Sequence, residues 1–134
     1  MKFFITIILL ALNLNVYAGD YKQTEQLLDT NKTIIGETVH YPGGMKAEIK
    51  SMVVVMKPGE KTAVHKHGVP LYAYMLSGEL EVDYGKYGKK IYRTGDNFME
   101  AMDQYHQGVN IGPDDVRILA VFMGGNGQPL VIKE

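Results

Sequence analysis

The sequence has no cysteine among its 134 residues, and it has no strong excess of charge of either sign. Without cysteine the protein cannot form a disulfide, a thiolate metal site or a thiol nucleophile, so a metal would need nitrogen or oxygen ligands. Four histidines could supply the nitrogen. Fourteen Lys and Arg residues against fifteen Asp and Glu residues give a net charge of −1. This balance lacks the positive field that binds a phosphate backbone, so we expect no nucleic-acid partner.

Long hydrophobic runs are also missing, and the one extended apolar stretch lies at the N-terminus. Residues 3–12 are mostly apolar, which is about half of the roughly 20 residues that a membrane-spanning helix needs. The run follows Lys2, and Val16 and Ala18 stand at positions −3 and −1 of a cleavage site. This pattern is typical of a bacterial secretory signal peptide over residues 1–18. We expect an exported, periplasmic protein without stable membrane insertion after cleavage; the alternative is an uncleaved membrane anchor.

The rest of the chain has the length and composition of one globular domain. Residues 19–32 are expected to form a polar N-terminal arm, and residues 33–134 the folded domain. From residue 33 onward, β-branched and aromatic runs alternate with glycine and proline turns, without helical periodicity of any length. The predicted strands span residues 33–37, 47–56, 62–67, 71–76, 79–84, 89–93, 97–101, 105–111, 116–122 and 130–133. The sequence therefore predicts an all-β sandwich or barrel.

Three histidines carry the most informative pattern of the domain. His65 and His67 are separated by one residue, so on a strand their side chains share one face and can reach one ion. His106 stands at the start of another predicted strand, after a second glycine-marked turn. Neutral imidazoles bind divalent Fe, Mn, Zn, Ni or Cu, and three of them leave positions open for water or substrate. The fourth histidine, His40, precedes a turn by itself and is expected to lie on the surface.

The spacing around these histidines resembles the two sequence motifs of the cupin superfamily. The matching positions are Gly59, His65, His67 and Gly78 in the first motif and Gly95, His106 and Asn110 in the second. Leu71 occupies the place of the first motif's glutamate, and Ala101 and Asp103 replace the proline and a glycine of the second. More narrowly, the chain is similar to small, exported, single-domain bacterial cupins.

The resemblance implies a double-stranded β-helix, or jelly-roll barrel, with a metal inside it. The implied ligands of one divalent ion are His65, His67 and His106. Leu71, Ala73 and Met75 share one strand face and would line the pocket. Without the motif's glutamate the site would keep the full charge of the dication, which favours an anionic ligand. Homodimers are common among cupins, so the resemblance also suggests a homodimer.

Two carboxylates lie close to His106 in sequence and could compensate for the missing glutamate. Glu100 is the candidate for the cavity, as a partner of a metal ligand or as a general base; the alternative places it on the rim. Asp103 is expected to be a turn residue with a left-handed backbone, which Asp tolerates. Asn110 is expected to hold backbone in place rather than to contact a substrate.

These observations predict a metal-binding cupin that acts as a metal-dependent enzyme of the dioxygenase, isomerase or lyase type. Its substrate would be a small anionic or carbonyl-bearing metabolite bound at the open metal positions. One alternative is a non-catalytic periplasmic module that binds a small molecule or the metal itself. Another is a structural barrel with a vestigial site. A base beside the metal would separate the enzyme from the binding module, and Glu100 is the residue available for that role.

Overall fold

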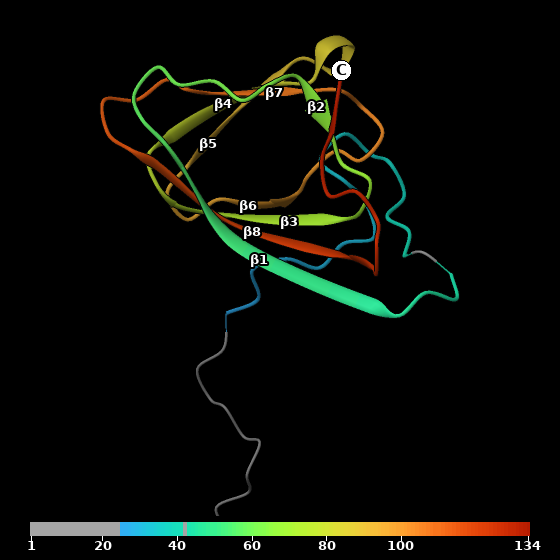
Figure 1. Cartoon of the computed structure of the whole chain (residues 1–134). Coiled ribbons are helices and arrows are strands. Elements are labelled where there is room, and N and C mark those ends of the chain that lie inside the picture. Colours follow the sequence, from blue (N-terminus) through green and yellow to red (C-terminus); the bar gives the residue numbers. More distant parts are fainter. Residues whose placement is uncertain (1–24, 42) are drawn as a thin grey trace, which may run out of the picture.

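The structure of the protein, a computed structural model, describes residues 25–41 and 43–134. The predicted signal peptide, residues 1–18, lies outside the described residues and stays a prediction. Two antiparallel sheets face each other (Figure 1). The first sheet has the order β1 (Ala47–Met56), β8 (Val116–Gly125), β3 (Leu71–Ser77) and β6 (Asn97–Met99). The second has the order β5 (Lys89–Arg93), β4 (Glu79–Asp83) and β7 (Gln107–Asn110).

A short third pair, β2 (His65–Lys66) with β9 (Ile132–Lys133), completes the architecture, and a 3-10 turn, η1 (Gly85–Tyr87), leads from β4 to β5. The predicted all-β class is confirmed. Within the described ranges, no helix has the length and hydropathy to cross a membrane.

Alternation of side chains along the strands produces the core between the two sheets. In β4, Leu80 and Val82 are buried, whereas Glu79 and Glu81 pair with basic residues of the neighbouring strand β5. Packing of the inward residues is dense, since Met75 has no exposed surface and the Tyr92 and Phe98 rings stack with centroids 3.8 Å apart. Burial of such side chains is the main source of stability for a barrel of this size.

The strand predicted at residues 33–37 is wrong. These residues form a turn closed by a bridge between Lys32 and Thr38, with Gly36 at a φ of 91°. The Thr33 hydroxyl accepts the Glu37 N–H at 3.1 Å, which supplies locally the hydrogen bond that a sheet would have provided. The strand predicted at residues 62–67 is also shorter than expected and is limited to His65–Lys66.

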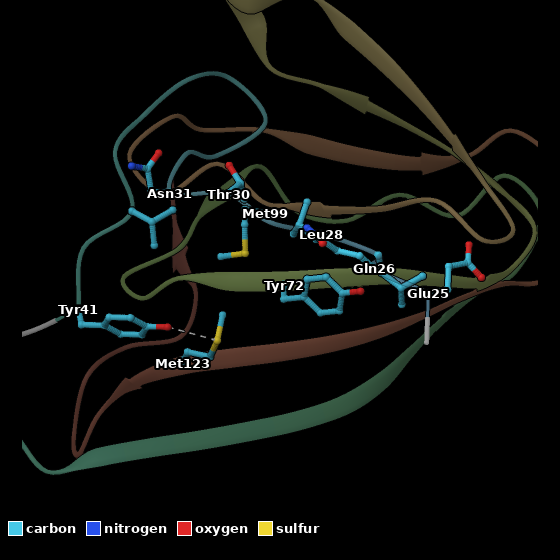
Figure 2. Close-up of a pocket in the computed structure, with 11 residues that line it drawn as sticks. Glu25, Gln26, Leu28, Thr30, Asn31, Tyr41, Tyr72, Met99 and Met123 are labelled. Carbon is cyan, nitrogen blue, oxygen red and sulfur yellow. Dashed lines mark hydrogen bonds between the residues drawn. The ribbon is translucent and has the colours of Figure 1, made fainter. Parts of the chain in front are cut away.

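Residues 25–31, Val39 and Tyr41 lie against the outer face of the first sheet (Figure 2), whereas Ile34 and Ile35 pack against the core. The Ile34 N–H donates to the Met99 carbonyl at 2.8 Å, which ties this segment to β6. A hollow of about 650 Å³ remains between the segment and the sheet, lined among others by Leu28, Tyr41 and Tyr72. It contains no histidine and lies on the opposite side of the sheet from the three clustered histidines.

Asn110 holds three backbone segments together, as predicted. Its buried amide donates to the Met56 carbonyl at 2.9 Å and to the Asp114 carbonyl at 2.8 Å. Its side-chain oxygen accepts the Gly112 N–H at 2.9 Å. The end of β1 and the loop between β7 and β8 are therefore fixed to β7 by one side chain.

Gly78, between β3 and β4, provides a test of the barrel's packing. Its φ is 85°, and a Cβ there would approach the Val116 Cα to 2.7 Å and the Asp115 carbonyl oxygen to 2.8 Å. Gly78→Ala should lower the free energy of unfolding by at least about 2 kcal/mol, measured by urea denaturation. In the control Gly43→Ala a Cβ meets no atom within 4 Å, and the change should stay within about 0.5 kcal/mol. Equal midpoints for the two variants would contradict this packing.

Candidate metal centre

The barrel brings His65, His67 and His106 together through backbone pairing. His65 and His106 form an antiparallel bridge, in which the His65 N–H donates to the His106 carbonyl at 3.0 Å and the His106 N–H returns the bond at 2.8 Å. His67 follows β2, and its ring centroid lies 5.0 Å from that of His65. One potential ligand atom from each of the three residues lies within 4.8 Å of the others.

Backbone carbonyls fix the orientation of all three imidazoles. The Nδ1 atom of His65 contacts the Ala63 carbonyl at 2.8 Å, that of His67 the Leu130 carbonyl at 3.0 Å, and that of His106 the Gln104 carbonyl at 2.9 Å. A carbonyl oxygen only accepts, so each Nδ1 of a neutral ring carries the proton and each Nε2 keeps its lone pair. This arrangement is typical of metal-binding histidines, whose second nitrogen donates to a backbone carbonyl or a carboxylate.

The surroundings of the histidines favour the neutral rings that bind metal. His67 and His106 are almost fully buried, and His65 is half-buried. Burial lowers the pKa of His65 and of His106, and it lowers the pKa of His67 to about 3. A metal ion would therefore compete with a proton for these nitrogens only at acidic pH.

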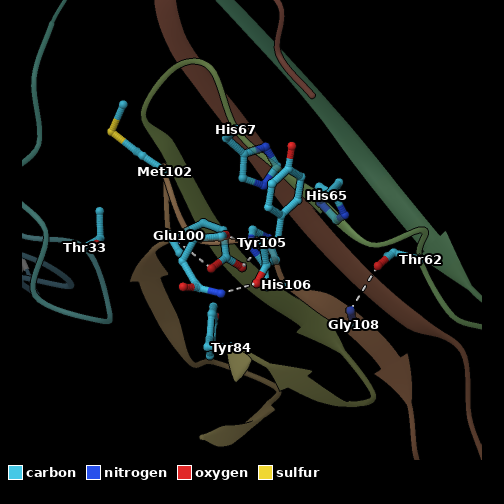
Figure 3. A network of polar contacts seen from close by, with 12 residues as sticks. Thr33, Thr62, His65, His67, Tyr84, Glu100, Met102, Tyr105, His106 and Gly108 are labelled. Atoms are coloured by element: carbon cyan, nitrogen blue, oxygen red, sulfur yellow. Dashed lines mark hydrogen bonds and ion pairs between the residues drawn. The ribbon is translucent and has the colours of Figure 1, made fainter. Parts of the chain in front are cut away.

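Glu100 lies inside the cavity rather than on its rim. Its side chain is buried, and its Oε2 lies 3.8 Å from His106 Nε2 (Figure 3). Its Oε1 accepts the Ala101 N–H at 2.7 Å. Burial raises the pKa of Glu100 to about 7, while hydrogen bonds from Tyr84 and Ala101 act in the opposite direction. A carboxylate thus stands beside the histidines, which corrects the expectation of an uncompensated dication.

The carboxylate of Glu100 lies next to the position of the missing glutamate. Glu100 directly follows β6, and its N–H donates to the Leu71 carbonyl at 2.8 Å, so the two residues are neighbours. Leu71 presents an apolar side chain to the same cavity. The site therefore keeps a buried carboxylate, but at the end of β6 rather than on β3.

Glu37 is a residue that sequence reasoning missed. Its two carboxylate oxygens accept the Met102 and Asp103 N–H groups, each at 2.8 Å, and one of them also accepts the Thr33 hydroxyl at 2.9 Å. Residues 101–105 join Glu100 to His106, so Glu37 holds the loop that carries both. Asp103 lies in a bend, but not in the expected left-handed conformation, because no described residue other than glycine has a positive φ.

A cavity of about 190 Å³ opens beside the histidines and is lined mainly by apolar side chains of both sheets. Leu71 and Ala73 line it, as the resemblance implied. Met75, which was expected there too, is instead fully buried in the packed core and is not among the lining residues. The alternation of side chains along β3 correctly predicted that Met75 points to the interior. Other core side chains separate it from the cavity. His40 is exposed, as expected.

Comparison with known families identifies the fold. The Cupin domain profile (Cupin_2) matches residues 52–122, which are 71 of the 134 residues. The chain belongs to the cupin family. The matched range contains the three clustered histidines and Glu100, so the candidate metal centre lies within the matched part of the chain.

Solved structures share the barrel. An uncharacterized conserved protein with a double-stranded β-helix domain from Klebsiella pneumoniae is 25% identical, with a TM-score of 0.54 over 71% of this cupin and 91% of that chain. The polyketide cyclase RemF from Streptomyces resistomycificus is 18% identical, with a TM-score of 0.56 over 73% of this cupin and 68% of that chain. The predicted double-stranded β-helix is therefore confirmed.

A mutant of oxalate decarboxylase from Bacillus subtilis is 22% identical, with a TM-score of 0.54 over 63% of this cupin. The alignment spans about a quarter of that enzyme, 23% of its length, so it shows a common fold and no common activity. No curated protein matches the chain.

The low pKa of His67 predicts how the metal-free protein responds to acid. Between pH 6.5 and about 3 the unfolded chain binds a proton at this histidine and the folded protein does not, so folding stability falls as the pH falls. His67→Gln should reduce the slope of unfolding free energy against pH by up to about 1.4 kcal/mol per pH unit. Urea denaturation of chelator-treated protein between pH 6.5 and 4.5 measures the slope.

The matched control is His40→Gln, which replaces an exposed histidine and should leave the slope unchanged. Identical slopes for wild type and His67→Gln would show that His67 is not buried in its neutral form.

Proposed function

We propose that this cupin is an enzyme that binds one divalent metal ion through the Nε2 atoms of His65, His67 and His106. The observation that carries the proposal is the set of three hydrogen bonds from Nδ1 to backbone carbonyls, which leaves the Nε2 lone pairs available in three histidines whose ligand atoms lie within 4.8 Å of one another. Three neutral nitrogens fit divalent iron, manganese, zinc, nickel or copper. Glu100, 3.8 Å from His106 Nε2, adds negative charge close to these nitrogens.

The position of Glu100 supports an enzyme rather than a passive binding module. A buried carboxylate is costly unless a cation or a function requires it, and within the described part of the chain the only basic side chain paired with Glu100 is His106. The Ala101 N–H fixes Oε1, while Oε2 faces the histidines and can take a proton from a bound substrate. When bound, the metal ion would polarise substrate oxygens, and iron would also allow reaction with dioxygen.

The solved structures that share the fold are those of proteins with varied chemistry. They include an oxalate decarboxylase, a polyketide cyclase and the DMSP lyase DddQ from Ruegeria pomeroyi, the last at 18% identity with a TM-score of 0.55. Among the dioxygenase, isomerase and lyase types, these names favour a reaction of the lyase type. A dioxygenase reaction would require iron in the site.

Metal analysis tests the proposal directly. Protein purified without added chelator should contain about one divalent ion per chain by elemental mass spectrometry, and His106→Ala should lose at least nine tenths of it, since one of three ligands is gone. Circular dichroism should show that the variant keeps its strands. His40→Ala is the matched control and should keep the full metal content. Equal metal content in both variants would overturn the proposed ligands.

Glu100→Gln separates the enzyme from a binding module. The amide keeps the size of the side chain and an oxygen for the Ala101 N–H, but it cannot take a proton at neutral pH. We expect metal content within a factor of two of wild type and a turnover at least about 100-fold lower, measured on 2-oxo acids and enolisable ketones. A variant as active as wild type would exclude Glu100 as the base.

A further inference from the structure

The cavity beside the histidines is built to hold an apolar body. Its floor is the inner face of the first sheet, where the side chains of one row come from all four strands. The row consists of Phe98, Ala73, Ala120 and Met52. Ala73 and Ala120 are neighbours on adjacent strands in the middle of the row. Because their side chains are small, the cavity is deepest above them.

Larger side chains surround this low point. Phe122 lies two residues from Ala120 on the same face of β8, and Ile118 lies two residues away on the other side. Leu80 and Val82 of β4 contribute to the opposite wall. The cavity of about 190 Å³ is somewhat larger than an apolar cavity of about 150 Å³ that holds benzene. A six-membered ring or a branched chain of similar size therefore fits above the alanines.

Polar side chains are a minority of those that line the cavity. They are the imidazoles of His65 and His67, the Glu100 carboxylate and the Thr62 hydroxyl, and the Gly108 N–H donates to that hydroxyl at 3.0 Å. No lysine or arginine is present among the described residues that line the cavity. Lys50, two residues from Met52 and on the same side of β1, forms an ion pair with Glu48 at 3.1 Å. A second negative charge on a ligand would thus lie against the apolar wall of the cavity, where no cationic side chain could neutralise it.

We propose that the ligand of this site has an apolar body of about six to eight carbon atoms and carries its oxygen functions at one end, with at most one negative charge. The oxygen-bearing end lies at the histidines and the body lies over Ala73 and Ala120. The inference rests on the proposed metal site and narrows its substrate class. It excludes compact dianions such as oxalate as preferred ligands.

Benzoylformate and oxalate are a matched pair of probes. Both contain a carboxylate bonded to a second carbonyl carbon, and on that second carbon benzoylformate has a phenyl ring where oxalate has a negatively charged oxygen. Isothermal calorimetry on the zinc-loaded protein, which carries no redox chemistry, should give a Kd at least tenfold lower for benzoylformate. The metal-free protein should bind both at least tenfold more weakly, because the head then has no cation.

Ala120→Phe tests where the ring binds. A phenyl side chain at this position fills the low point of the floor, so benzoylformate should bind at least tenfold more weakly while zinc content stays at one per chain. Val121→Phe is the control, because the neighbouring residue of β8 points to the outer face of the sheet and its added ring leaves the cavity unchanged. If Ala120→Phe does not fold, Ala73→Val offers a smaller obstruction and should weaken benzoylformate at least threefold.

The outcomes separate the two proposals. Absence of zinc binding to the wild-type protein would overturn the metal site. Stoichiometric zinc with oxalate bound as tightly as benzoylformate, or more tightly, would overturn the ligand class and leave the metal site intact. Unchanged benzoylformate affinity in Ala120→Phe, or in Ala73→Val where that variant is used, would overturn the placement of the apolar body.

Discussion

The proposed metal site of this cupin depends on three hydrogen bonds from histidine Nδ1 atoms to backbone carbonyls. The carbonyls belong to Ala63 before β2, Gln104 in the loop before β7, and Leu130 before β9. Three separate segments must therefore be in register before the three Nε2 atoms can converge. The short strand β9 meets part of this requirement. It contributes no ligand of its own, but it pairs with β2 and so holds the Leu130 carbonyl against His67.

Burial has opposite effects on the two kinds of polar group at the centre. Desolvation keeps the imidazoles neutral, which prepares them for a cation, and it disfavours the Glu100 carboxylate as long as no cation is present. A dication held by the histidines would reverse the second effect, because its field stabilises a carboxylate nearby. A metal ion at the histidines would thus favour the ionised form of Glu100. Glu37 supports this arrangement from a distant part of the chain, since its carboxylate fixes the loop between Glu100 and His106.

Sequence reasoning succeeded where local pattern determines structure. The bounds of β1 and β5 were predicted correctly, because each is a regular β-rich run between glycine turns. The three histidines were found from their spacing together with its resemblance to the cupin motifs. Residues 33–37 were mispredicted, because Ile34 and Ile35 have high strand propensity while side-chain hydrogen bonds and Gly36 impose a turn.

Two features of the site could not be read from spacing, since they depend on contacts between distant residues. Glu37 accepts hydrogen bonds from the N–H groups of Met102 and Asp103, which lie 65 and 66 residues further along the chain, and no local sequence pattern predicts such a contact. The location of Glu100 follows from the register of β3 against β6, which places it beside Leu71. That register also supports the proposed ligand class. With the carboxylate directly after β6, Leu71 is free to extend the apolar wall. A dication and Glu100 together carry one positive charge, so a ligand with one negative charge makes the buried centre neutral, whereas a dianion leaves an unpaired charge in an apolar cavity.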